Sequence, residues 1–103
     1  MTNARYDVVG LGNAIVDVIS QTDDDFLADW GIIKNNMNLI EADRADALTR
    51  ASKNALETSG GSGANTIAGI ASLGGRAAYI GKVADDRLGK VFRDDMASIG
   101  VPF

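Results

Sequence analysis

The sequence contains no cysteine and no histidine, and it has a single proline in 103 residues. Without cysteine the chain can form no disulfide framework and no thiolate zinc site, and it offers no thiolate nucleophile. Without histidine, proton transfer falls to carboxylates, to lysine or to the substrate, and a metal ion could be held only by oxygen ligands. These absences exclude the enzyme classes whose chemistry depends on sulfur or imidazole.

Basic residues are also few. The sequence has 10 lysines and arginines against 14 aspartates and glutamates, and the basic residues form no cluster. Nucleic acid is therefore not expected as a partner. No apolar run approaches the roughly 18 residues that a membrane-spanning helix needs, and the first residues lack the pattern of a signal peptide. We expect one small domain that is cytoplasmic and has no membrane partner.

Glycine is abundant, and its most informative cluster lies at residues 59–65. Gly60 and Gly61 form a turn without β-carbons directly before a helical pattern, so a ligand can approach the main chain there. Ser62 is predicted to cap this helix, whose free N–H groups then point toward a polar ligand. Asn65 adds an amide that both donates and accepts, which suits a hydroxyl-rich ligand.

The residues after this turn alternate between helical and strand patterns. Apolar residues at helical spacing predict a helix that ends at Gly74, and a short apolar strand follows over residues 77–83. A second helix begins after Asp85 or Asp86, either of which can cap it, and ends at Gly100. This rhythm predicts an α/β fold with a parallel sheet.

The first strand, predicted within residues 6–11, runs into Gly10 and Gly12, a pair found in dinucleotide-binding turns. That fingerprint has a third small residue three positions after the second glycine, where this chain has Ile15. We therefore disfavour a dinucleotide site and expect a strand that ends in a glycine break.

Asp17 interrupts an apolar strand predicted over residues 15–20. A lone carboxylate on a strand often just faces solvent, so the residues by themselves leave a structural role and a binding role open.

Asp23, Asp24 and Asp25 suggest a metal site, but consecutive side chains at a helix start point in different directions around the helix axis and complement its dipole. We therefore predict that these three aspartates begin a helix.

Several motifs in the second half, correctly spaced, resemble the first signature of the PfkB (ribokinase-like) carbohydrate and nucleoside kinases. They are Gly60 to Asn65, Leu73-Gly74, Ile80-Gly81 and Asp86 to Gly89. Ala84 departs from the glycine usual in the family. The resemblance extends over essentially the whole chain, and its opening, with Gly12-Asn13, Asp17 and Asn38-Leu39-Ile40, is similar to the adenosine kinase-like branch.

The resemblance implies a ribokinase-like fold, a parallel-sheet α/β core with a small β lid, of which residues 1–103 form only the N-terminal third. Lid strands are expected near residues 15–20, 37–40 and 55–59. In the family, the asparagine and aspartate that match Asn13 and Asp17 bind substrate hydroxyls. The expected substrate-binding set is Asn13, Ile15, Asp17, Leu39, Gly60, Gly61, Ser62 and Asn65, although packing within the lid explains Ile15 and Leu39 equally well.

The implied activity is ATP-dependent phosphotransfer to a hydroxymethyl group of a nucleoside or sugar, with magnesium screening the phosphates. The catalytic base and the residues that bind ATP and magnesium belong to a second signature outside these 103 residues. No catalytic residue or metal ligand is therefore assigned here, and the chain alone is expected to be inactive. The alternatives are a ribokinase- or fructokinase-like sugar kinase and a non-catalytic sugar- or nucleoside-binding module. Copies of the chain are expected to associate through the lid or an exposed sheet edge.

Overall fold

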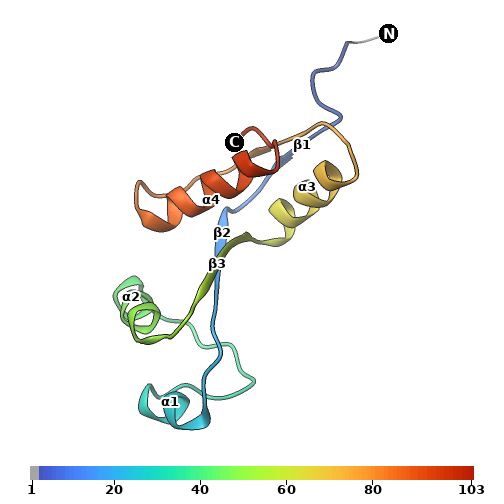
Figure 1. Cartoon of the computed structure of the whole chain (residues 1–103). Helices are drawn as coiled ribbons and strands as arrows, with labels where there is room; N and C mark the ends of the chain where they lie inside the picture. Colours follow the sequence, from blue (N-terminus) through green and yellow to red (C-terminus); the bar gives the residue numbers. More distant parts are fainter. Residues whose placement is uncertain (1–2) are drawn as a thin grey trace. The chain divides into compact units, whose positions relative to one another are not determined.

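The computed structural model describes residues 3–103, which fold into two compact units (Figure 1). Unit 1 comprises the described residues up to Asp17 together with Glu57–Phe103, and unit 2 comprises Val18–Leu56. The elements, in chain order, are β1 (Val8–Leu11), β2 (Ile15–Ile19), α1 (Asp24–Asp29), α2 (Ala42–Ala51), β3 (Leu56–Gly60), α3 (Ser62–Ser72), β4 (Ala77–Ile80) and α4 (Arg87–Ser98).

Strands β1 and β4 of unit 1 pair in parallel, with Val8 opposite Ala77 and Gly10 opposite Tyr79. A second two-stranded sheet joins β2 to β3. Parallel strands cannot be joined by a tight turn, and here α3 precedes β4 as the crossover helix. The parallel pairing confirms the predicted α/β class.

An ion pair fixes the start of the parallel sheet. The Arg76 main-chain N–H donates to the Asp7 carboxylate at 2.8 Å, and the Arg76 guanidinium donates to its other oxygen at 3.0 Å. The side-chain hydrogen bond from Arg76 lowers the pKa of the Asp7 carboxyl, and the same bond raises the pKa of the Arg76 guanidinium. The pair thus joins the residues that precede β1 and β4.

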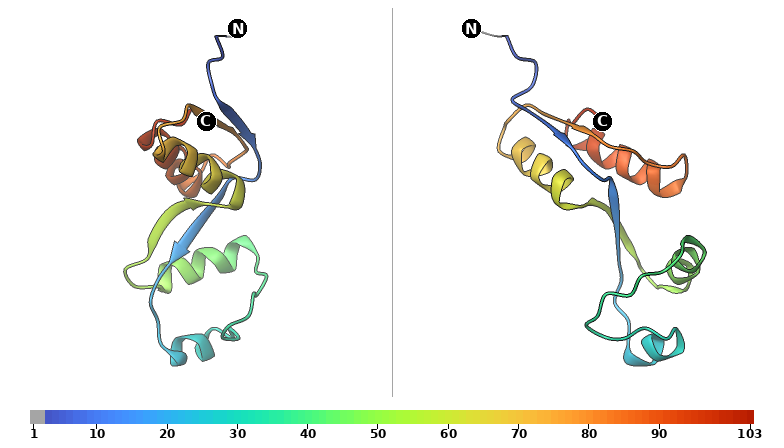
Figure 2. Two further views of the ribbon diagram at one scale, coloured as in Figure 1. Left: turned by 90° about the vertical axis from the view of Figure 1, so that its right-hand side faces the viewer. Right: turned by 180° about the vertical axis from the view of Figure 1, so that it is seen from behind.

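The core of unit 1 lies where α3 and α4 cover one face of this sheet (Figure 2). Its buried members are Ala64, Ile67, Ala77, Tyr79, Phe92, Met96 and Val101. Close packing needs a glycine in β1, because a β-carbon at Gly10 would lie 2.9 Å from the Ile67 side chain. The rings of Phe92 and Phe103 meet edge to face at 4.9 Å between centroids. The core thus combines small residues at the helix–sheet contact with an aromatic cluster.

The larger side chains that alternate to the opposite face of the sheet remain exposed, whereas the small Ala78 on that face is buried. Val9, Leu11 and Ile80 have 52, 80 and 54 % of their surface accessible. Parallel sheets are ordinarily covered on both faces, and in unit 1 the described residues cover only one of them.

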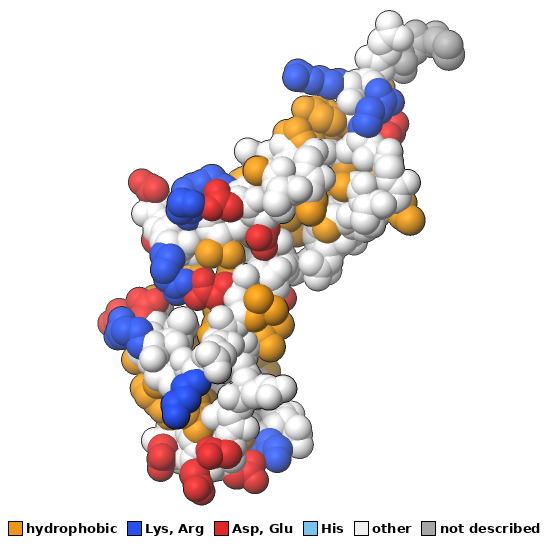
Figure 3. Space-filling model, in the orientation of Figure 1, with side chains coloured by type: hydrophobic (Ala, Val, Ile, Leu, Met, Phe, Trp, Pro, Cys, Tyr) orange, Lys and Arg blue, Asp and Glu red, His pale blue; other side chains and the backbone are white. Residues whose placement is uncertain are grey.

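Unit 2 contains α1 and α2, and α1 begins as predicted. The Asp23 carboxylate accepts a hydrogen bond from the Phe26 N–H at 2.9 Å, which caps the helix. Asp24 and Asp25 occupy the first turn, and acidic side chains gather on the surface over α1 (Figure 3). Gly31, with a φ of +64°, follows the last residues of the helix.

The strand predicted over residues 37–40 is wrong. This segment has no regular secondary structure, and Met37 and Leu39 are 87 and 90 % exposed. A strand requires a neighbour for its main-chain hydrogen bonds, and among residues 3–103 the four strands pair only as β1 with β4 and β2 with β3. The β-prone composition of Met37–Ile40 therefore has no ladder to join.

The strand predicted over residues 77–83 is shorter than expected, because β4 ends at Ile80 before Gly81. Across the described part of the chain, every helix is too short or too polar to traverse a lipid bilayer.

We expect Phe92→Ala to destabilise the full-length protein by about 3–5 kcal/mol, because Phe92 is fully buried against Tyr79 and Phe103. Urea unfolding followed by circular dichroism measures this change. The control is Arg93→Ala at the next, exposed position, which we expect to change stability by less than about 0.5 kcal/mol. Equal unfolding midpoints for the two variants would contradict the assignment of the core.

Candidate functional site

The bend between β1 and β2 positions Asn13. The Tyr79 hydroxyl donates a hydrogen bond to the Asn13 main-chain carbonyl at 3.2 Å. A β-carbon at Gly12 would lie 2.6 Å from the same hydroxyl, so only glycine leaves room for this contact. The Asn13 side chain is exposed, and no residue in the described range hydrogen-bonds to its amide. Its donor and acceptor are thus available to a ligand.

The Asp17 carboxylate lies against the main chain of Gly60. A β-carbon at Gly60 would overlap the Asp17 Oδ2 atom and lie 2.7 Å from Cγ. Asp17 comes from β2 and Gly60 ends β3, so the pairing of these two strands sets the contact. The carboxylate is exposed, and no donor within residues 3–103 hydrogen-bonds to it. Both of its oxygens can therefore accept hydrogen bonds from a ligand.

Gly61 brings the turn after β3 close to the residues around Asn13. Its φ of +91° lies in the region that favours glycine. A β-carbon there would lie 3.3 Å from Ile15 Cδ1 and 3.4 Å from the Asn13 carbonyl oxygen. Together with Asp17 beside Gly60, five of the predicted binding residues gather in one part of unit 1.

Ser62 does not cap α3, contrary to the prediction. Gly61 occupies the N-cap position without a side-chain hydrogen bond, and Ser62 is the first helical residue. A capping side chain must come from a residue with non-helical φ and ψ, which Ser62 no longer has. The turn requires a positive φ at the cap, and glycine meets this requirement.

The first turn of α3 therefore presents main-chain N–H groups that carry no side-chain cap. Ser62 and Asn65 are exposed on this turn, three residues apart and thus neighbours on the helix surface. The Asn65 N–H donates to the Gly61 carbonyl at 2.9 Å and closes the first turn.

Leu39 is the one predicted site residue that belongs to unit 2. It lies in the irregular segment after α1, with its side chain exposed. A role for Leu39 in ligand binding stays a prediction.

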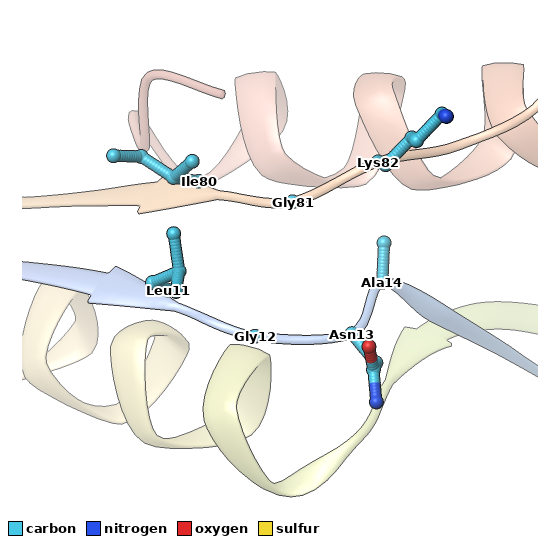
Figure 4. A pocket seen from close by; sticks show the side chains of 7 residues that line it. All are labelled: Leu11, Gly12, Asn13, Ala14, Ile80, Gly81 and Lys82. Carbon is cyan, nitrogen blue, oxygen red and sulfur yellow. The ribbon is translucent and has the colours of Figure 1, made fainter.

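A hollow of about 450 Å³ opens where the parallel strands β1 and β4 end (Figure 4). Its lining residues are Leu11, Gly12, Asn13, Ala14, Ile80, Gly81 and Lys82. Ligands of α/β proteins commonly bind at this carboxyl edge. The side chains of Asn13 and Lys82 point away from each other in Figure 4, whereas Leu11 and Ala14 point toward the β4 side of the hollow. The hollow is thus mainly apolar, and the groups suited to hydroxyls lie instead around Asp17 and Gly60.

Sequence reasoning missed Tyr79 as a residue that shapes the site. The available signal was a single aromatic residue in a strand of otherwise small and aliphatic side chains. Buried tyrosines usually find a hydrogen-bond partner, and here the partner is the main chain of a predicted binding residue.

Within residues 3–103 no group of three or more acidic side chains is arranged to hold a metal ion.

The family model described as pfkB family carbohydrate kinase matches residues 24–103. Among curated proteins, the 5-dehydro-2-deoxygluconokinase of Lacticaseibacillus casei is 32 % identical over 97 residues, which cover 94 % of this chain and 23 % of that protein. This chain thus spans less than a quarter of the length of that relative.

Two solved structures are similar in both sequence and fold. The adenosine kinase from Sinorhizobium meliloti is 60 % identical with a TM-score of 0.75, and the match covers 97 % of this chain and 31 % of that one. A probable sugar kinase from Rhizobium etli CFN 42 is 54 % identical with a TM-score of 0.74, and the match covers 95 % and 30 % of the two chains. These likenesses confirm the expected ribokinase-like fold. Because the family model matches most of its length, the chain belongs to the pfkB family of carbohydrate kinases.

Proposed function

We propose that the full-length protein carrying this chain transfers the γ-phosphoryl group of ATP to a hydroxymethyl group of a nucleoside, as an adenosine kinase does. The chain itself would supply the acceptor-binding side of that enzyme. Membership of the kinase family supports the reaction class, and the 60 % identity to an adenosine kinase supports the choice of a nucleoside. The observation that carries the binding role is the exposed Asp17 carboxylate beside Gly60.

A carboxylate in this position suits a ribose diol. Its two oxygens can accept hydrogen bonds from two adjacent hydroxyls, and the negative charge strengthens both bonds. Because Gly60 has no side chain, the Asp17 carboxylate can lie directly against the main chain of β3. The Asn13 main-chain carbonyl neighbours Gly61, and the exposed Asn13 amide offers a further donor and acceptor.

The start of α3 would add weaker polar contacts. Its uncapped N–H groups favour electronegative atoms, because the helix dipole is positive at this end. Ser62 and Asn65 present side-chain donors and acceptors on the same turn. The role that we propose for all these residues is to hold the acceptor in one orientation, which is how phosphotransferases gain much of their rate.

Ile15 offers an apolar contact for the base, since its side chain is 45 % exposed beside the Gly61 turn. ATP and magnesium are the proposed co-substrate and cofactor, and residues outside this chain would bind them.

A free sugar is the second candidate acceptor. The 54 % identity to a probable sugar kinase favours it, as does the relation to a gluconokinase. A comparison of kcat/KM for adenosine and for a panel of free sugars distinguishes these two acceptors. A protein that binds such ligands without turnover would instead be a non-catalytic binding module.

We expect Asp17→Asn in the full-length protein to weaken acceptor binding by about 1–3 kcal/mol, because the side chain keeps its shape but loses its charge. Isothermal titration with adenosine measures the loss. Asp85→Asn, at an exposed position before α4, is the matched control and should leave the affinity unchanged. An Asp17→Asn variant with the affinity of the wild type would remove the diol-binding role.

We expect Gly60→Ala to reduce acceptor affinity by at least roughly tenfold, because the new methyl group must displace the Asp17 carboxylate. Gly69→Ala in α3 is the control, since a β-carbon there has no neighbour within 4 Å. Fluorescence or calorimetric titration of both variants tests the prediction. If Gly60→Ala binds as tightly as Gly69→Ala, close approach at Gly60 is not required.

We expect residues 1–103 in isolation to show no phosphotransfer and no heat on titration with magnesium-ATP, because no residue of this chain is assigned to the base or to nucleotide binding. Light scattering on the same sample tests the proposed association of copies, which the exposed face at Val9, Leu11 and Ile80 would favour. Turnover by the isolated chain would show that the catalytic groups lie within it.

A further inference from the structure

Asp95 of α4 makes a contact to β3 that the proposed function does not use. Its Oδ2 atom accepts a hydrogen bond from the Ser59 main-chain N–H at 2.6 Å and one from the Thr58 hydroxyl at 3.3 Å. The aspartate is half-buried, and Ser59 immediately precedes Gly60. A charged acceptor thus holds the last part of β3 directly before the candidate site.

A second contact joins the same helix to the same strand. Arg87, the first residue of α4, donates to both carboxylate oxygens of Glu57. The Glu57 side chain is only 18 % exposed. Arg87 and Asp95 lie about two turns apart on α4, so the helix holds β3 at two points.

Helix α4 is itself fixed by the core. Phe92 and Met96 are 0 and 1 % exposed, and Met96 follows Asp95 directly. The position of the Asp95 carboxylate is therefore set by core packing. The Ser59 N–H belongs to the planar peptide unit that joins Thr58 to Ser59, so its hydrogen bond fixes the Ser59 Cα atom. Gly60 is the next residue of the same strand, and only the extended φ and ψ of Ser59 lie between the fixed atoms and Gly60.

We infer that Asp95 is a positioning residue for the acceptor site, which holds Gly60 at the distance from Asp17 that the acceptor hydroxyls require. It touches no ligand and acts through the Ser59 main chain. The effect on acceptor binding rests on the proposed function, whereas the restraint on the turn does not.

The neighbouring Asp94 provides the matched control. It lies on the same helix with the same charge, but it is exposed and pairs with Lys90 one turn earlier. Removal of Asp94 changes the net charge of the helix as removal of Asp95 does, without touching β3.

The test compares Asp95→Ala, Asp95→Asn and Asp94→Ala in the full-length protein. Steady-state kinetics with adenosine and ATP give KM for each substrate and kcat, and amide hydrogen exchange reports on Ser59 to Gly61. We expect Asp95→Ala to raise the adenosine KM about tenfold while kcat and the ATP KM stay within about twofold. Amide exchange at Ser59 and Gly60 should be faster in Asp95→Ala than in the wild type. Asp95→Asn should restore most of the adenosine KM and of the slow exchange, because its amide oxygen still accepts a hydrogen bond. Asp94→Ala should match the wild type in both measurements.

Unchanged exchange at Ser59 and Gly60 in Asp95→Ala would overturn the inference, whatever the activity. Equal losses in kcat and in both KM values, together with a lowered melting temperature, would also overturn it, because they indicate a general structural role. A third outcome separates the two proposals. If exchange is faster in Asp95→Ala but the wild-type protein phosphorylates neither nucleosides nor sugars, the proposed function and the effect on acceptor binding are refuted. The restraint on the turn is then still established.

Discussion

The buried hydroxyl of Tyr79 links the core of unit 1 to the candidate site. The ring packs against Phe92 in the core, while the hydroxyl donates to the Asn13 carbonyl at the bend after β1. The Tyr79 hydroxyl lies so close to residue 12 that only glycine fits there, since a β-carbon would be 2.6 Å from the oxygen. A β-carbon at Gly63 would lie 3.1 Å from the same oxygen. A buried hydroxyl left without a partner would be costly, so the hydrogen bond restrains the bend at Asn13.

The site uses glycine and charge in complementary ways. Gly60 and Gly61 have no side chains where they lie against Asp17 and Ile15 of β2 and against the Asn13 carbonyl in the bend before β2. Asp17 is exposed, so its carboxylate avoids the large desolvation free energy of a buried, unpaired charge when no ligand is bound. Recognition by such a site depends on the relative placement of main-chain segments more than on many side chains. The role that we propose for α4 is to restrain those segments.

Two predictions made from residue type were wrong, the helix cap at Ser62 and the strand over residues 37–40. In each case the surrounding backbone decided the structure. Serine is a preferred capping residue, yet the positive φ required at Gly61 moved the cap one position earlier and left Ser62 inside α3. Residues Met37–Ile40 have a β-prone composition, yet they have no partner strand among the described residues. In both cases the residue type indicated a structure that the neighbouring backbone did not permit.

The sequence by itself determined the elements and most of the candidate residues. Glycine turns, capping aspartates such as Asp23 and Asp86, and apolar periodicity mark local structure, because their effects act within one or two turns of the chain. The contacts of Tyr79 with Asn13 and of Asp95 with Ser59 join residues 66 and 36 positions apart. Only the tertiary structure decided them, since a hydrogen bond between distant segments depends on how the helices and strands pack and leaves no periodic pattern in the sequence.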